Sequence, residues 1–140
     1  INGPNLNLLG RREPEIYGSR SFEDFFTELR AQYPDIRLDY FQSNHEGALL
    51  DWIHEAGRLH AAGNLAGLVL NAGAYTHTSV ALQDAIKGTG ITLIELHISN
   101  VHAREAFRHH SYISPAAKAV MAGFGVNGYA LAIAGLAGMQ

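Results

Sequence analysis

The feature that most constrains the fold of this chain is the abrupt change of residue type from the apolar segment Ile91–Ile94 to the polar stretch Glu95–Arg108. A short aliphatic run of this kind is typical of a strand that is covered on both faces of a parallel sheet. In open parallel α/β sheets, ligands bind just beyond the carboxyl ends of the strands. The change therefore predicts a functional site at the end of a buried strand. A helix N-terminus with solvated charges is the alternative interpretation.

Short apolar segments alternate with helix patterns along the whole chain. Leu65–Leu70 is almost wholly apolar, as expected for another buried strand, whereas residues 36–42 alternate between apolar and polar as an edge strand does. The expected strands are Ile1–Gly3, Ile36–Gln42, Leu65–Leu70, Ile91–Leu96 and Ala119–Gly123, and the expected helices lie at about 22–32, 46–56, 79–86 and 129–136, with a short polar helix after Ser99.

Two of the expected helices begin with the spacing of a capping box, Ser21 with Asp24 and Ser43 with Glu46. Five strands that alternate with helices predict right-handed parallel connections and a three-layer α/β sandwich. We expect a flavodoxin-like fold, in which a five-stranded parallel sheet carries helices on both faces. The 140 residues correspond to a single catalytic domain, and the start of its first strand is expected upstream of the sequence given.

The composition argues against several classes of partner. Ten Lys plus Arg residues against thirteen Asp plus Glu give a formal charge of −3, so the chain lacks the basic field that attracts a nucleic acid. No apolar run approaches the roughly 18 residues that span a bilayer. The chain contains no cysteine, which removes disulfides and thiolate metal sites and suits a reducing cytoplasm. We therefore expect a cytoplasmic protein without a nucleic-acid or membrane partner.

The run from Gly123 to Gly128 matches the dinucleotide-binding pattern G-x-G-x-x-G. That pattern belongs to the first βα turn of its domain and needs a further strand with an acidic residue about 20 positions later. Only twelve residues follow Gly128. We therefore interpret these glycines as sites of close helix–sheet packing.

Three other kinds of catalytic centre have little support in the sequence. His54 is followed by Arg58 at the position where a zinc-protease helix carries its second His, so no metal is expected. Ser79 lacks the surroundings of a nucleophile elbow and is better explained as a helix cap. Lys87 and Lys118 lie at a helix end and in a surface-like turn, so neither is a good candidate for a Schiff-base lysine.

Polar residues gather at the ends of the expected strands, which all open on one edge of the sheet. They combine hydrogen-bonding groups with cations, and the carboxylates each lie near a His or an Arg in the sequence. Each residue alone has an ordinary structural explanation, such as an Asn in a turn, but their convergence predicts a pocket for a small polyhydroxylated anion. The groups are Asn5 and Asn7, Gln42–His45, Asn71–His77 and Glu95–Arg108.

A set of motifs along the chain follows the order found in one known family. The motifs are Gly3–Gly10, Arg12–Pro14, Tyr17–Gly18, Gln42–Gly47, Asn71–Ser79, His97–Asn100, Arg104–Glu105 and Phe107–Arg108. Over nearly its whole length the sequence resembles the type II 3-dehydroquinate dehydratases. The resemblance implies a lyase of the shikimate pathway of aromatic amino acid biosynthesis, or of quinate breakdown. It would convert 3-dehydroquinate to 3-dehydroshikimate by anti elimination through an enolate, without metal, Schiff base or other cofactor.

The resemblance also implies catalytic roles for individual residues. Tyr17, as tyrosinate, would remove a proton from the carbon beside the ketone, and Arg12 on the same loop would lower the pKa of its phenol. His97 would protonate the leaving hydroxyl, with Glu95 holding the imidazolium. Asn5 would hold a water that stabilises the enolate oxygen.

The other implied residues bind the substrate or belong to the assembly. Ile98 and Ser99 would bind the substrate carboxylate through backbone N–H groups and the hydroxyl. The family forms trimers assembled into a homododecamer, in which Asp84 would reach a neighbouring subunit's site. The charged loop Gly10–Arg20 is expected to be a mobile lid. The remaining substrate-binding residues are Asn71, which would also orient the acid, Gly73, His77 and Arg108.

A non-catalytic flavodoxin-like signalling module and a nucleotide-binding module are the alternatives. A response-regulator-like domain needs an acidic pair after the first strand and a lysine after the fifth, but this chain has Gly3-Pro4-Asn5 and Gly123-Phe124 at those places. The nucleotide-binding module is opposed by the position of the glycine pattern. The enzyme is therefore the preferred prediction.

Overall fold

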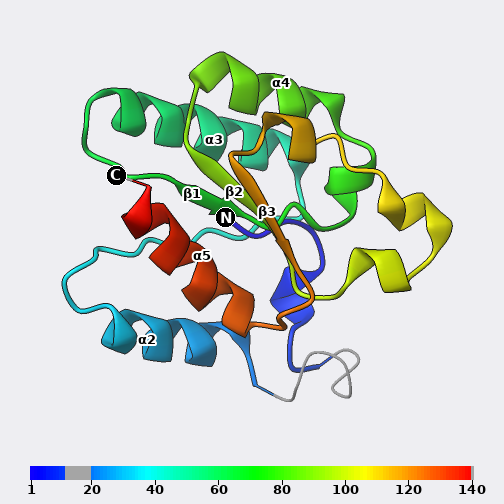
Figure 1. Ribbon diagram of the computed structural model, residues 1–140, viewed down its shortest axis with the longest axis horizontal. Coiled ribbons are helices and arrows are strands. Elements are labelled where there is room, and N and C mark those ends of the chain that lie inside the picture. The colour runs from blue at the N-terminus through cyan, green and yellow to red at the C-terminus, as the bar shows by residue number, and fades with distance from the viewer. Residues whose placement is uncertain (12–19, 140) are drawn as a thin grey trace.

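A three-stranded parallel sheet lies at the centre of the molecule, with helices on both of its faces (Figure 1). The structure is a computed structural model that describes residues 1–11 and 20–139. The strands are β1 Leu68–Leu70, β2 Leu93–His97 and β3 Ala119–Ala122, in that order across the sheet. The helices are α2 Phe22–Gln32, α3 Glu46–Ala61, α4 Val80–Thr89 and α5 Asn127–Gly138, and the 3-10 turns are η1 Leu6–Leu8, η2 Gly73–His77, η3 Val101–Ala103, η4 Ala106–His109 and η5 Ser114–Ala116.

Two more segments join the sheet beside β1, each through a single bridge. Asn2 pairs in parallel with Asn71 on one side and with Gln42 on the other. The predicted α/β class with a parallel sheet is confirmed, but the five-stranded sheet is not, because the described residues form three strands and two such bridges. Within the described residues, the predicted strand at 36–42 is represented by the bridge of Gln42 with Asn2.

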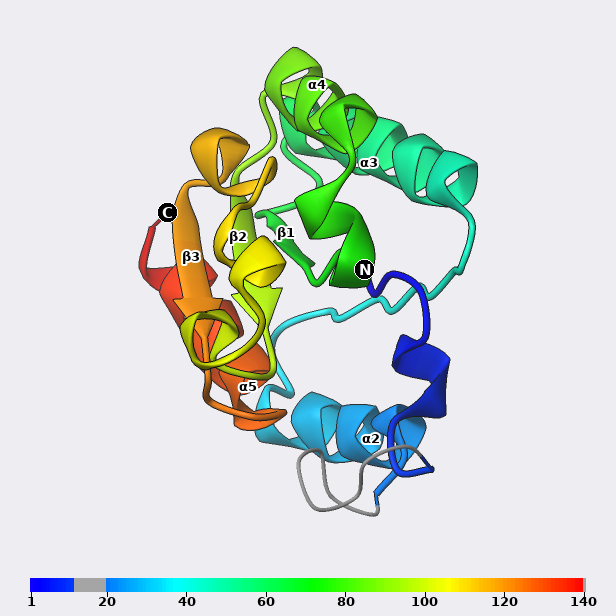
Figure 2. The same cartoon turned by 90° about the vertical axis from the view of Figure 1, so that its right-hand side faces the viewer.

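The helices cover the sheet in two layers, with α3 and α4 on one side and α2 and α5 on the other (Figure 2). Successive side chains of β2 point alternately into these layers. Leu93 belongs to the core under α3 and α4, whereas Ile94 and Leu96 belong to the core under α2 and α5. Glu95 and His97 lie on the same face of β2 as Leu93, so their side chains point toward the layer of α3 and α4. This register places two polar side chains together at the end of β2.

Side-chain caps fix the starts of two helices as the sequence predicts. Ser21 accepts a hydrogen bond from the N–H of Asp24 at 3.1 Å at the start of α2, and Ser79 accepts one from Leu82 at 3.0 Å at the start of α4. The predicted capping box of α3 is wrong. The helix begins after His45, which makes no side-chain cap, because the Ser43 hydroxyl accepts the N–H of His45 instead.

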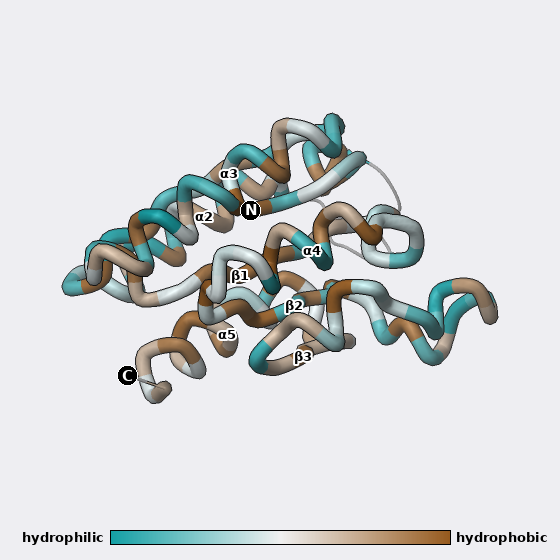
Figure 3. The backbone as a smooth tube through the Cα atoms, turned by 90° about the horizontal axis from the view of Figure 1, so that it is seen from above, coloured by the Kyte–Doolittle hydropathy of each residue, from teal (hydrophilic) through white to brown (hydrophobic). Residues whose placement is uncertain are grey.

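The glycines after β3 allow α5 to lie close to the sheet, as we inferred from the sequence. A Cβ on Gly128 would lie 3.2 Å from Cδ1 of Leu96 on β2, and Gly123 has φ +88°, which favours glycine. α5 is largely apolar along its length (Figure 3). Even so, within residues 1–11 and 20–139 no helix combines the length and the apolar character needed to cross a membrane.

The stretch after β2 forms two short 3-10 turns, η3 and η4, and not the single helix predicted after Ser99. It projects from the body of the molecule at the right of Figures 1 and 3. The side chain of Asn100 accepts a hydrogen bond from the N–H of His102 at 3.1 Å. Local turns of this type compete with an α-helix for the same backbone groups, which explains why the predicted helix does not form.

Replacing Gly57 with Ala should lower the free energy of unfolding by about 1–3 kcal/mol. A Cβ at this position of α3 would lie 2.4 Å from the Cβ of Thr89, at the end of α4, so one helix would have to move. Gly47 on the same helix is a matched control: a Cβ there meets no atom within 4 Å, and Ala is favoured over Gly in a helix by about 0.5–1 kcal/mol. Urea denaturation compares the two variants, and equal stabilities would contradict this packing of α3 on α4.

Candidate active site

A cleft of about 240 Å³ opens at the carboxyl ends of β1 and β2, next to the turn η1. This is the edge of the sheet where the sequence predicts a site. Eight of the twelve predicted site residues line the cleft. They are Asn5 beside η1, Asn71, Gly73 and His77 after β1, His97, Ile98 and Ser99 at the end of β2, and Arg108 on η4.

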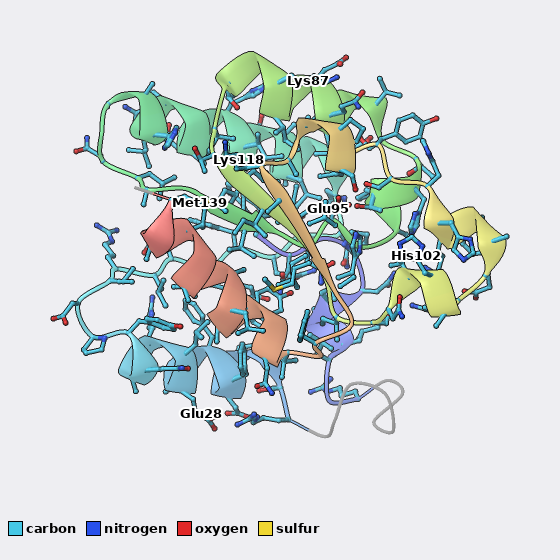
Figure 4. All side chains as sticks on the ribbon, viewed as in Figure 1. Glu28, Lys87, Glu95, His102, Lys118 and Met139 are labelled. Carbon is cyan, nitrogen blue, oxygen red and sulfur yellow. The ribbon has the colours of Figure 1, made fainter. Side chains whose placement is uncertain are left out.

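A buried carboxylate, Glu95, lies directly behind the cleft in the middle of β2 (Figure 4). Glu95 is completely buried, with 0% of its surface exposed. Oε1 accepts hydrogen bonds from Oγ1 of Thr76 at 2.9 Å, from Nε2 of His97 at 2.9 Å and from Oγ of Ser111 at 2.6 Å. Oε2 accepts one from the hydroxyl of Ser114. Four donors therefore satisfy a charged group that would otherwise be costly to bury.

These donors decide the ionisation state of Glu95. Burial acts to raise the pKa of the carboxyl group, but the hydrogen bonds from His97, Ser111 and Ser114 and the charge of His97 together outweigh it and hold the pKa below its ordinary value. The carboxylate is therefore ionised at neutral pH.

His97 links this carboxylate to the cleft. A hydrogen bond with Glu95 holds its ring at Nε2. His97 lines the cleft, and its other ring nitrogen, Nδ1, takes no part in that bond. The ring of His77 lies nearly parallel to it, with 6.5 Å between the ring centroids and 13° between the planes. Nδ1 of His77 lies 2.7 Å from the carbonyl oxygen of His110, and this hydrogen bond orients the His77 ring. Two oriented imidazoles therefore face the cleft from neighbouring strand ends.

A second buried chain of hydrogen bonds holds Asn71. Its Nδ2 donates to the hydroxyl of Tyr129 on α5 at 3.1 Å, and its Oδ1 accepts from the N–H of Gly73 at 3.2 Å. The hydroxyl of Tyr129 in turn donates to Oδ1 of Asn2 at 2.7 Å, and burial raises the pKa of this phenol far above its ordinary value. Within the described residues Asn71 makes no hydrogen bond with His97. The bond that orients the His97 ring comes from Glu95, and not from Asn71 as the resemblance implies.

Two arginines lie at the outer side of the cleft. Nη1 of Arg104 lies 3.4 Å from the hydroxyl of Ser99, and Nε of Arg108 donates to the carboxylate of Glu105 at 2.8 Å. Nε of Arg104 lies 3.6 Å from the same carboxylate. Guanidinium groups suit carboxylate ligands because they offer several N–H donors in one plane. This side of the cleft is therefore suited to an anion.

The other four predicted site residues either do not line the cleft or lie outside the described residues. Glu95 does not line the cleft and bonds to His97, as described above. Asp84 is exposed on α4 and does not line the cleft of its own chain. Arg12 and Tyr17 lie outside the described residues, as does most of the loop Gly10–Arg20 that was expected to be a lid.

Several residues of the site had no individual role assigned from the sequence. Thr76 and Arg104 lie within the predicted polar groups Asn71–His77 and Glu95–Arg108; Thr76 donates to Glu95, and Arg104 lines the cleft. Ser111 and Ser114, which also donate to Glu95, and Tyr129, which holds Asn71, lie outside these groups. The two serines carry no signal of their own, because Ser is equally common in turns and caps.

Neither lysine takes part in the site. Lys87 on α4 and Lys118 just before β3 are both exposed, and neither lines the cleft (Figure 4). Within residues 1–11 and 20–139, no three His, Cys, Asp or Glu side chains are grouped as a metal site would require. Among the described residues, the polar side chains that line the cleft carry imidazole, amide, hydroxyl and guanidinium groups.

Comparisons with known proteins point to one family. The family model described as dehydroquinase class II matches residues 1–137. A 3-dehydroquinate dehydratase of Acidovorax sp. (strain JS42) is 69% identical, over 98% of this chain and 94% of its own length. The type II dehydroquinase of Butyrivibrio crossotus superposes with a TM-score of 0.90 at 44% identity, over 98% of this chain and 94% of that one. The type II dehydroquinase of Propionibacterium acnes gives a TM-score of 0.89 at 38% identity, over 98% and 92%.

The lowered pKa of Glu95 predicts acid sensitivity of the fold. A carboxyl group with a depressed folded-state pKa contributes stability above its unfolded-state pKa, here 4.5, and this stability is lost as the pH falls through the folded-state pKa. The free energy of unfolding, measured by urea denaturation from pH 7 downward, should therefore begin to fall near pH 4.5. The Glu95→Gln variant should show a weaker dependence over this range. Parallel curves for the two proteins would show that Glu95 is not the responsible group.

Replacing Tyr129 with Phe should lower the free energy of unfolding by about 1–3 kcal/mol, because Asn71 and Asn2 both lose a buried partner. Tyr33→Phe is a matched control that removes a single hydrogen bond, to the carbonyl oxygen of Ala130 at 2.9 Å. It should cost about 1 kcal/mol or less. Urea denaturation measures both variants, and a loss no greater in Tyr129→Phe would argue against the buried chain.

Proposed function

The chain belongs to the class II dehydroquinase family and is a hydro-lyase of the 3-dehydroquinate dehydratase type, and from this premise we propose that Tyr17 and His97 carry out the elimination. The substrate is a small polyhydroxylated acid with a ring ketone. In the proposed reaction a proton leaves the carbon beside the ketone, an enolate forms, and a hydroxyl group then departs as water. Anti elimination requires the base and the acid to approach opposite faces of the ring.

His97 is the proposed general acid, and its contact with Glu95 is the observation that carries the proposal. The 2.9 Å bond between Nε2 and Oε1 holds the ring at the edge of the cleft. The ionised carboxylate favours the imidazolium form, so that Nδ1 can carry the proton for the leaving hydroxyl. A neutral His in the same place would have no proton on that nitrogen to donate.

Tyr17 is the proposed base, and its assignment depends on the family motif because the residue lies outside the described structure. An ordinary phenol with a pKa of about 10 is less than about 1% ionised at neutral pH. A cation within reach can lower such a pKa by about 1–3 units. Arg12, which has the matching place in the motif, is the proposed cation, and Gly10–Arg20 is the proposed lid.

The remaining groups of the cleft suit the other parts of the substrate. Ile98 and Ser99, at the end of β2, are the proposed seat of its carboxylate, with the guanidinium of Arg104 3.4 Å from the Ser99 hydroxyl. His77 and Arg108 are the proposed partners of the ring hydroxyls. Asn5 would hold the water that stabilises the enolate oxygen. Asn71 and Gly73 would complete the contact on the side of β1.

The assembly and the cellular setting belong to the same proposal. We expect trimers that form a homododecamer, in which Asp84, exposed on α4, reaches the cleft of a neighbouring subunit. We place the reaction in the cytoplasm, without cofactor or metal. The substrate is the small molecule 3-dehydroquinate, and no nucleic acid or membrane takes part.

His97→Ala and Tyr17→Phe should each lower kcat by about 100-fold to 10,000-fold with 3-dehydroquinate as the substrate, because each removes a proton-transfer group. The conjugated enone of the product is followed by its ultraviolet absorbance. His54→Ala, on the exposed face of α3, is the control and should keep wild-type activity.

Two results would contradict the proposal. Wild-type kcat in Tyr17→Phe would exclude Tyr17 as the base. Inactivation by borohydride in the presence of substrate would indicate a Schiff base, which neither Lys87 nor Lys118 is placed to form in the described cleft.

A further inference from the structure

The hydroxyl group of Ser111 is the most strongly fixed of the groups around Glu95. Its Oγ accepts the N–H of Ile113 at 3.0 Å and the N–H of Ser114 at 3.0 Å, and it donates to Oε1 of Glu95 at 2.6 Å. A serine hydroxyl has one proton and two lone pairs. Both lone pairs are used by the backbone, so the single proton of Ser111 is directed to the carboxylate.

Ser111 acts on the same oxygen that holds His97. Oε1 of Glu95 receives the Nε2 bond of His97 at 2.9 Å, whereas Ser114 bonds to the other oxygen, Oε2. The position of Oε1 sets the direction of the imidazole ring, because within residues 1–11 and 20–139 the hydrogen bond that orients the ring is this one at Nε2. Ser111 itself does not line the cleft. It is therefore in a position to control the acid without touching the substrate.

We propose that Ser111 is a positioning residue for proton transfer, which fixes Oε1 of Glu95 and through it the direction of the His97 ring. This inference rests on the proposed function, in which His97 is the general acid. It adds to that function a donor from the turn before η5, a part of the chain far from β2 in sequence. The turn is tied to the cleft a second time, since the N–H of Tyr112 donates to the carbonyl oxygen of Thr76 at 2.9 Å.

The surroundings of Glu95 make its ionisation depend on Ser111. In the sheet, Glu95 lies opposite Leu70 of β1 and Val120 of β3, which are both apolar. η2, the turn before η5 and the first residue of η5 contribute the neutral hydroxyl groups of Thr76, Ser111 and Ser114, and the titratable group that bonds to Glu95 is His97. Removing the Ser111 donor should therefore make Glu95 easier to protonate.

Ser111→Ala should lower kcat by about 10-fold to 100-fold, as expected for the loss of a hydrogen bond to a charged group. KM should change little, because Ser111 does not line the cleft. Here kcat is expressed per folded enzyme, so that a loss of folding alone does not lower it. A purely structural role would therefore reduce the amount of folded enzyme and leave this kcat unchanged.

Two further variants and one control complete the experiment. Ser111→Cys keeps a weaker donor of similar shape and should restore part of the kcat that Ser111→Ala loses. This variant carries the test if Ser111→Ala does not fold, which circular dichroism and thermal unfolding determine. Ser21→Ala removes a capping hydroxyl at α2 and should leave kcat and KM unchanged.

The outcomes separate this inference from the proposed function. If His97→Ala is inactive while Ser111→Ala and Ser111→Cys keep the wild-type kcat, the positioning role is wrong and the function stands. A loss confined to KM would overturn it as well. If His97→Ala keeps wild-type activity, the proposed function fails, and the inference fails with it.

Discussion

The charged carboxylate of Glu95, buried in the middle of β2, is the constraint on which the rest of the structure depends. A buried charge is tolerated only when it is paired and hydrogen-bonded. Its donors come from three parts of the chain, which are η2, the end of β2 and the segment 111–114 that leads into η5. All three must return to one point behind the cleft. The segments that shape the site are therefore held in place by the group that also holds His97, the proposed acid.

The hydrogen-bonded chain from Asn71 through Tyr129 to Asn2 forms a second constraint on the other face of the sheet. Tyr129 belongs to the core under α2 and α5, whereas Glu95 points toward α3 and α4. Apolar cores accept several packings of similar energy, but buried polar groups need particular partners in particular directions. The two networks therefore fix the strand ends from both sides, and the cleft between them keeps one shape.

Some features that depend on neighbours in the sequence could be predicted, such as the cap at Ser21 and the buried strand before His97. The capping box at Ser43 could not, because its hydroxyl accepts the N–H of His45 instead. The alternation at 36–42 shows which side chains face the protein, but not whether an adjacent backbone pairs with them, and of this predicted strand the structure has the single bridge of Gln42 with Asn2. Ser111 lies 16 residues from Glu95, and nothing in its own surroundings distinguishes it from a turn former.

The two nitrogens of His97 explain why such an elaborate support suits an acid. The Nε2–H bond to Glu95 is present in the imidazolium and also in the neutral ring that remains after Nδ1 has given up its proton. The ring therefore keeps its hydrogen bond and its direction through the proposed cycle, and only the proton on Nδ1 changes. Donors and charges that need not rearrange during the reaction stabilise its transition state most effectively. A carboxylate free to rotate would lose this property, because the ring would follow it out of line.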